Sequence, residues 1–232
     1  MATIARWLLL VLVVAISACS SANPTVHSVG DPSVEDLRER AEKGDPAAQW
    51  RLGSRYDTGH GVPRDGAEAE KWYRRSAESG YAEAQNSLGS VYQAEHRYKD
   101  AVVWYQKAAD QGHPLALNNL AYMYDLGLGL AQDRRRAFDL YTKAANQGNP
   151  QSMLNIAIVY GSGQIGDKDV EQAYIWLLRA KRYRTNCFAH DSQLDDGRVD
   201  RLIRYSEGKL SLKEQEQARR ISADWSPAGK CK

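Results

Sequence analysis

The sequence is poor in the groups on which enzyme and metal chemistry usually depend. Its 232 residues include 3 cysteines and 5 histidines, and no two histidines lie close together in the chain. It has no H-E-x-x-H motif and none of the paired cysteine and histidine spacings of zinc sites. No serine lies in a G-x-S-x-G elbow. We therefore expect no catalytic site, no metal and no cofactor, and we interpret His60 and His113 as exposed turn residues.

An excess of charge of one sign is also missing. The chain has 31 lysines and arginines against 29 aspartates and glutamates, and both signs are mixed along every segment. A nucleic-acid-binding domain needs basic residues clustered on one face or along one helix. The charge pattern therefore argues against a nucleic-acid partner.

The one strongly apolar run is too short to span a bilayer as a helix. Trp7 to Ile16 reads WLLLVLVVAI and follows a single arginine. A bilayer-spanning helix needs about 20 apolar residues, whereas a run of this length suits the core of a signal peptide. By itself the run is compatible with an ordinary secretory signal or with an uncleaved anchor.

The residues that follow this run, Ile16-Ser17-Ala18-Cys19, resemble the lipobox of bacterial lipoproteins. The resemblance implies that residues 1–18 are removed as a signal peptide and that Cys19 carries the lipid anchor. Ser20 rather than aspartate follows the cysteine, which by analogy with that class favours the outer membrane, facing the periplasm. Residues 19–33 are small, polar and proline-bearing, and we expect a flexible tether.

Two further cysteines, Cys187 and Cys231, remain near the end of the chain. An exported protein can form disulfides. The pair is therefore a possible disulfide, but two free thiols fit the sequence equally well, since spacing along the chain does not fix their distance.

A repeat dominates the rest of the chain. A small residue recurs near the start of each unit at intervals of 36, 32 and 36 residues, at Ala48, Ala84, Ala116 and Ser152. A glycine closes each unit with the same intervals, at Gly44, Gly80, Gly112 and Gly148. A period of this size is typical of solenoids built from stacked supersecondary units.

Each unit reads as two helices joined by a turn. In the first unit, Asp45 and Asp65 are placed to cap the two helices. Gly53 lies inside the first helix, where glycine costs about 1 kcal/mol relative to alanine. We interpret it as the point where a large ring of the second helix, Trp72 or Tyr73, comes close.

The order of these landmarks, A-x-x-x-L-G-x-x-Y-x-x-G-x-G-V-x-x-D-x-x-x-A-x-x-W-Y-x-x-A-A-x-x-G, resembles the Sel-one-like repeat family, a branch of the tetratricopeptide-like repeats. The resemblance implies an all-α fold, a right-handed α-solenoid of antiparallel helix pairs whose first helices line the concave side. It covers a partial unit, 34–44, and four units, 45–80, 81–112, 113–148 and 149–183. We expect residues 184–232 to form a helical C-terminal cap that includes a capping box at Ser211 and Glu214.

One stripe of the first helices is the predicted binding surface. It lies about 200° from the buried stripe, because two residues along a helix rotate the side chain by that angle. Stacked units would align it along the concave wall, with polar residues in the middle and apolar or aromatic residues at both ends. An ordinary solvated face, or contacts to the neighbouring unit, is the alternative. The stripe consists of Trp50, Ser54, Asp57, Asn86, Ser90, Gln93, Asn118, Tyr122, Asp125, Leu154 and Ile158.

The resemblance implies a function because members of this family serve mostly as adaptors that hold other proteins. We expect a non-catalytic scaffold that binds a protein or peptide partner in the cell envelope. One alternative is a glycan- or peptidoglycan-binding protein that uses Trp50 and Tyr122 as stacking platforms. Another is a β-lactam-type hydrolase, as proposed for cysteine-rich relatives, but this chain lacks their paired cysteines.

Overall fold

The computed structural model describes residues 32–184 and 196–228. Contacts divide the chain into residues 1–33 and residues 34–232, and the fold described here is that of the second unit. The predicted lipidation site Cys19, residues 19–31 of the tether, and the possible disulfide between Cys187 and Cys231 lie outside the described residues.

The described residues form helices and no strands, which confirms the predicted all-α class. None of these helices is long and apolar enough to span a bilayer. The helices are α1 (Val34–Glu42), α2 (Pro46–Thr58), α3 (Gly66–Glu78), α4 (Ala82–Ala94), α5 (Tyr98–Asp110), α6 (Pro114–Leu126), α7 (Arg134–Asn146), α8 (Pro150–Ser162), α9 (Val170–Tyr183), α10 (Asp196–Glu207) and α11 (Leu212–Asp224).

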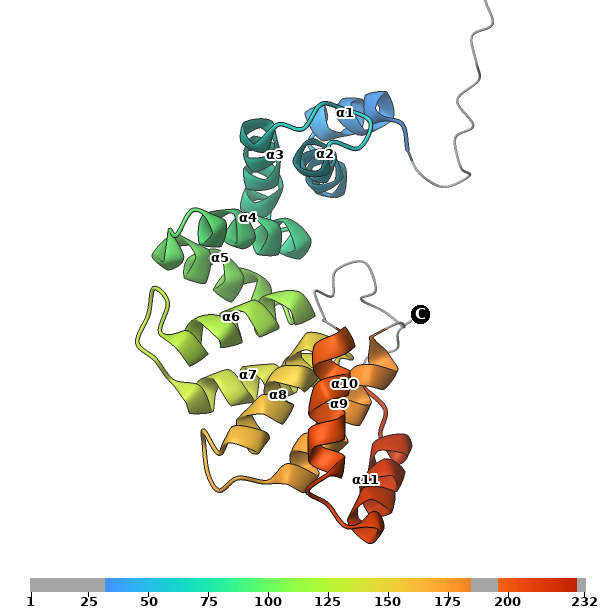
Figure 1. Cartoon of the computed structure of the whole chain (residues 1–232). Coiled ribbons are helices and arrows are strands. Elements are labelled where there is room, and N and C mark those ends of the chain that lie inside the picture. Colours follow the sequence, from blue (N-terminus) through green and yellow to red (C-terminus); the bar gives the residue numbers. More distant parts are fainter. Residues whose placement is uncertain (1–31, 185–195, 229–232) are drawn as a thin grey trace, which may run out of the picture. The chain divides into compact units, whose positions relative to one another are not determined.

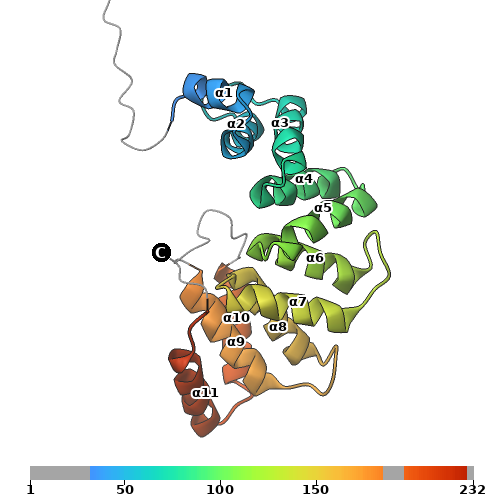
Figure 2. The same cartoon turned by 180° about the vertical axis from the view of Figure 1, so that it is seen from behind.

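The helices pack in chain order, as expected of an α-solenoid (Figures 1 and 2). The most extensive contacts join α2 to α3, α4 to α5, α6 to α7 and α8 to α9, and smaller ones join each pair to the next. From α1 to α9 each helix therefore touches mainly its neighbours in sequence, and the core runs as a chain of buried alanine, leucine and tyrosine side chains.

Side chains that precede the helices fix where they begin. The predicted caps are confirmed: Asp45 Oδ1 accepts from the amides of Ala47 and Ala48 at the start of α2, and Asp65 does the same for α3. His113 differs from the prediction. It is half-buried, and its Nδ1 accepts from the amide of Ala116, so it caps α6 rather than lying free in a turn.

The glycines inside the first helices let a tyrosine of the second helix come close. A Cβ built on Gly53 would lie 2.8 Å from Tyr73 Cδ1, and one on Gly89 would lie 2.6 Å from Tyr105 Cδ1. Real Cβ atoms do not approach other atoms this closely, so only glycine fits these rings. This confirms the interpretation of Gly53 and identifies Tyr73 as the ring.

The turn glycines serve contacts between units as well as chain reversal. Gly129 has φ +75°, and a Cβ there would lie 2.5 Å from the carbonyl carbon of Tyr98, at the start of α5 in the preceding unit.

The second unit lacks the long turn that joins the two helices in the other units. Its two helices are joined by only three residues, Glu95 to Arg97, and His96 adopts φ 59° in the middle.

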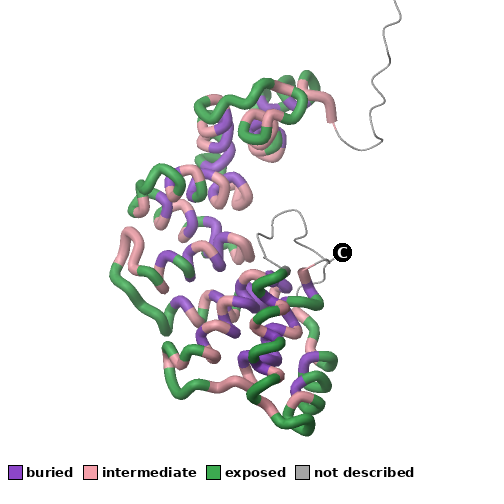
Figure 3. The backbone as a smooth tube through the Cα atoms, in the orientation of Figure 1, coloured by how far each residue is buried: buried purple, intermediate pink, exposed green. Residues whose placement is uncertain are grey.

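The last two helices pack on α9. Val199 and Ile203 of α10 and Ala218 of α11 join the buried cluster that includes α9. The capping box at the start of α11 is confirmed, with Ser211 Oγ accepting from the Glu214 amide and the Glu214 carboxylate accepting from the Ser211 amide. Most of α11 is exposed (Figure 3), so the array ends in a polar surface.

Candidate functional site

The first helices of units two to four enclose a long groove. It has a volume of about 860 Å³ and is lined from α4, α6 and α8, with additional side chains from α5, α7 and α10. The stripe residues predicted in these three units all line it: Asn86, Ser90, Gln93, Asn118, Tyr122, Asp125, Leu154 and Ile158.

The stripe residues of the first unit do not line the groove. Trp50 is half-buried, its ring centroid lies 6.0 Å from that of Tyr81, and its Nε1 donates to Ser87 Oγ at 3.0 Å. It therefore contacts the second unit instead of standing exposed as an anchor. Asp57 accepts from the Tyr73 hydroxyl at 3.5 Å, and Ser54 lies beside the same hydroxyl.

Several groove residues hold neighbouring units together. Asn119 Nδ2 donates to Asn86 Oδ1 at 3.0 Å, which joins α6 to α4. Asn118 Oδ1 accepts from Ser152 Oγ at 2.9 Å and from Asn155 Nδ2 at 3.2 Å, which joins α6 to α8. We call these contacts the amide ladder. The amides of Asn86 and Asn118 thus already have protein partners.

Leu154 is buried, although we expected the stripe residues to be exposed. Its exposed fraction is 1%, and it belongs to the same buried cluster as α9. The expectation that it lies exposed is therefore wrong, because at this level α8 packs closely enough on its neighbours to cover a leucine on that side. By contrast, Tyr122 keeps 40% of its surface exposed.

Tyrosines of the second helices supply groove groups that the sequence pattern assigned to the core. Tyr105 and Tyr141 are almost fully buried, yet both line the groove. The Tyr105 hydroxyl donates to Gln93 Oε1 at 2.8 Å and lies 3.1 Å from Ser90 Oγ. Burial raises the pKa of Tyr105 to about 12, so this hydroxyl stays neutral. For Tyr105 the sequence signal was Gly89, because a glycine inside the first helix lets the ring come close to that helix and bring its hydroxyl to the groove.

The groove carries little charge. Among its described lining residues only Asp125, from α6, and Arg198, from α10, are charged. The remaining polar groups are mostly side-chain amides and hydroxyls, which both donate and accept hydrogen bonds. Such a surface suits an uncharged or weakly charged chain with its own amide groups, and it lacks the convergent charges of a catalytic centre.

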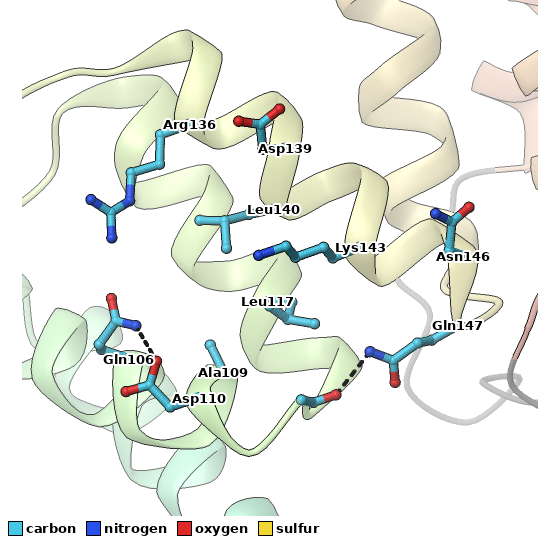
Figure 4. Close-up of a pocket in the computed structure, with 11 residues that line it drawn as sticks. Gln106, Ala109, Asp110, Leu117, Arg136, Asp139, Leu140, Lys143, Asn146 and Gln147 are labelled. Atoms are coloured by element: carbon cyan, nitrogen blue, oxygen red, sulfur yellow. Dashed lines mark hydrogen bonds between the residues drawn. The ribbon is translucent and has the colours of Figure 1, made fainter.

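A second pocket, of about 620 Å³, lies between α5 and α7 (Figure 4). Arg136 and Lys143 lie on its α7 side, while Asp110 lies on the α5 side and accepts from Gln106 Nε2 at 2.6 Å. The charges are mixed, and the aliphatic part of Lys143 lies near Leu140. In its chemistry this pocket is therefore an ordinary polar hollow of the protein surface.

Residues suited to metal or nucleophile chemistry do not converge in the described part of the chain. Residues 32–184 and 196–228 contain no group of three or more His, Cys, Asp or Glu that could hold a metal ion. Ser206 and Lys209 have the S-x-x-K spacing of penicillin-recognising enzymes. However, Ser206 is 3% exposed and its Oγ donates to the Leu202 carbonyl, so the serine is part of the helix packing.

The groove belongs to a repeat array with known relatives. A family model described as Sel1 repeat matches residues 46–81, 82–113, 114–149 and 150–182. These ranges each begin one residue after the units expected from the sequence. A comparison with curated protein sequences finds no match.

Two solved structures are similar over most of this chain. One is c5321, a protective antigen present in uropathogenic Escherichia coli strains displaying an SLR fold, with 32% identity and a TM-score of 0.71. The similarity covers 82% of this chain but 39% of that protein, so this chain spans about two fifths of its length. The other is a Sel1 repeat protein from Oxalobacter formigenes, with 26% identity, a TM-score of 0.67, and coverage of 85% of this chain and 78% of that one.

Proposed function

The chain belongs to the Sel1 repeat family, and from this premise we propose that it is a non-catalytic lipoprotein of the cell envelope that binds a protein or peptide along its groove. Sel1 repeat proteins typically act as scaffolds for protein interactions. The anchor at Cys19 and the position in the outer membrane are inferred from the leader sequence.

The groove is the observation that supports the proposed binding site. It runs over three consecutive units and combines exposed Tyr122 with side-chain amides that have donors and acceptors in close succession. An extended peptide presents the matching backbone groups at short, regular spacing. Tyrosine is also among the residues most often found at the energetic centres of protein interfaces.

A glycan remains the second candidate ligand because Tyr122 could stack on a sugar ring. Its other predicted platform, Trp50, is occupied by Tyr81 and Ser87. With one exposed ring in place of two, the geometry favours a peptide. A muropeptide tested against the purified protein distinguishes the two, since the proposal expects no saturable change in tryptophan or tyrosine fluorescence.

The test of the binding site is a photo-crosslinking amino acid placed in the groove of the protein in its native envelope. Position 122 is suitable because Tyr122 is 40% exposed, and Val103 on α5, 52% exposed and outside both pockets, is the matched control. We expect one protein partner to be captured at position 122 and not at 103. Tyr122→Ala should then weaken binding of that purified partner while Val103→Ala should not. Equal capture at both positions would contradict the groove assignment.

Asparagine substitutions are unsuitable for this test. Asn86→Ala or Asn118→Ala would remove bonds of the amide ladder and so disturb the packing of the units. The lipid anchor is tested separately. Cys19→Ala should yield an unprocessed or soluble form, and unchanged size and membrane fractionation would refute lipidation.

A further inference from the structure

The third unit breaks a rule that the first two units follow. In each of those units, the buried tyrosine of the second helix places its hydroxyl beside two residues of the first helix. Tyr73 donates to Asp57, and Tyr105 donates to Gln93. The middle position of the stripe is a serine in both, Ser54 and Ser90, and it lies beside the hydroxyl as well. The tyrosine is thereby satisfied within its own unit.

In the third unit the corresponding residues are Tyr141, Asp125 and Tyr122. Tyr141 is 2% exposed and lines the groove, and over the described residues its hydroxyl has no hydrogen bond. Burial, together with the nearby groups of Asp125 and Tyr122, raises the pKa of Tyr141, so the phenol is neutral. Among the described residues, the fully enclosed side-chain atoms without a partner are Gln49 Oε1 and Arg179 Nε, so the Tyr141 hydroxyl is not sealed in the core and opens on the groove.

Two substitutions explain the difference. Ala121 stands where the first two units have a helix glycine, and its methyl group excludes a ring from the position that Tyr105 occupies against Gly89. Tyr122 replaces the serine that lies beside the hydroxyl in the other units. The change leaves three oxygen-bearing side chains facing one part of the groove.

We propose that Asp125, Tyr122 and Tyr141 form a subsite for a basic side chain, lysine or arginine, of the protein partner. An ammonium or guanidinium group has only donors, and this subsite offers a carboxylate and two hydroxyl oxygens as acceptors. The exposed ring of Tyr122 adds a face for a cation. The inference rests on the proposed function, because it names one contact of the partner in the same groove.

The only described cation close to Asp125 does not fill this subsite. Arg134 Nε lies 3.8 Å from Asp125 Oδ1, and the Arg134 side chain is 49% exposed. An exposed pair at that distance contributes little. Arg134 therefore weakens the negative charge of the subsite without occupying its hydroxyls, and its removal should improve binding of a cation.

The experiment compares two short peptides on the full chain in detergent, labelled with ¹³C at tyrosine. The probes are acetyl-Gly-Gly-Lys-Gly-Gly-amide and the same peptide with acetyl-lysine, which has the same backbone and no charge. We expect the lysine peptide to shift the Tyr122 and Tyr141 signals and to bind about tenfold more tightly than its neutral counterpart, with the difference falling as salt is added.

Four variants complete the test. Asp125→Asn and Tyr141→Phe should each weaken lysine-peptide binding by about fivefold or more, which is the effect expected for loss of a charge-assisted contact. Tyr141→Phe removes no hydrogen bond of the free protein, so its unfolding midpoint should match that of the unmodified chain. Arg134→Ala should strengthen binding by about twofold, and Arg135→Ala, an exposed neighbour, should leave it unchanged.

The outcomes separate this inference from the proposed function. Equal binding of both peptides would overturn the basic-side-chain subsite while leaving a peptide-binding groove. Absence of a shift with either peptide also overturns the subsite. The proposed function itself fails only if crosslinking at position 122 captures no specific partner.

Discussion

A substitution in the first unit tests whether the repeats share one scheme of polar contacts. Gln49 is 6% exposed, and over the described residues its Oε1 has no hydrogen-bond partner. The equivalent residue of the second unit, Gln85, is satisfied, because its Oε1 accepts from Gln111 Nε2 at 2.7 Å. The same Gln111 amide also donates to the Gly80 carbonyl at 3.0 Å.

The position that supplies this donor is glutamine in the second and third units and serine in the first. Gln147 of the third unit donates to the Gly112 carbonyl at 3.0 Å, just as Gln111 donates to Gly80. Ser79 stands in the first unit, and its short side chain bonds the Arg75 carbonyl of its own helix. The unsatisfied oxygen of Gln49 is therefore explained by a side chain that is too short to reach it.

Ser79→Gln should stabilise the protein by about 1 kcal/mol. Satisfying a buried oxygen recovers about 1–3 kcal/mol, and a bond to the Gly44 carbonyl, equivalent to Gly80, adds about 1 kcal/mol. Ordering a glutamine side chain costs up to about 2 kcal/mol, and the exposed serine bond is lost. For a domain of this size the net gain raises the midpoint of thermal unfolding by about 2–4 °C.

Urea unfolding followed by circular dichroism measures this gain, and a second background identifies its source. In Gln49→Leu the oxygen is absent, as in the third unit, where Leu117 occupies this position beside Gln147. Ser79→Gln should then bring no gain, because the bond to the Gly44 carbonyl alone does not offset the cost of ordering the glutamine side chain. Glu78→Gln, one residue away and exposed, should have no effect. The same gain in both backgrounds, or no gain in the protein that keeps Gln49, would refute the reasoning.

Three other predictions follow from individual contacts. Gly129→Ala should destabilise the protein by at least about 2 kcal/mol in urea unfolding, because it combines a positive φ with a Cβ placed against backbone; an unchanged midpoint would contradict that packing. Tyr105→Phe should cost about 1 kcal/mol while Tyr141→Phe costs almost nothing, since only the first loses a hydrogen bond; equal costs would show that the two hydroxyls have similar surroundings. Asp45→Ala should cost about 1 kcal/mol at pH 7 as a lost helix cap. The hydrogen bond from Arg40, followed by the bonds from the cap amides, lowers the pKa of Asp45 below its ordinary 3.8, so its contribution is present above pH 4 and lost as the pH falls further; the deficit should therefore shrink at pH 3, and a constant deficit would exclude a role for the carboxylate charge.

The sequence predicts well those features that depend on a residue's own helix or on its immediate partner. Asp45 and Asp65 cap because aspartate before a helix competes for free amides whatever surrounds it. Gly53 predicts the large ring because glycine inside a helix needs a compensating contact. The period of the repeat and the all-α class follow from the same local signals, repeated four times.

The features that depend on the distance between units are harder to predict from the sequence. Helical periodicity gives the direction of a side chain about its own axis, but not how far away the next unit lies. Leu154 and Asn118 point along the predicted stripe, yet one is covered and the other bonds the neighbouring unit. Trp50 likewise contacts the second unit. A residue on this stripe can therefore face solvent or a neighbour, and the pattern alone does not separate the two.

The amide ladder also indicates where a partner can gain binding energy. Asn86 and Asn118 already have protein partners, and a ligand that replaced those bonds would exchange one hydrogen bond for another with little net gain. A larger gain is available where the array leaves a polar group of the groove without a protein partner. In the groove that condition is met at Tyr141, where the helix glycine and the stripe serine of the earlier units are both replaced. Specificity in such an array should therefore reside in the units that depart from the repeat, and the regular units should serve mainly to hold them in place.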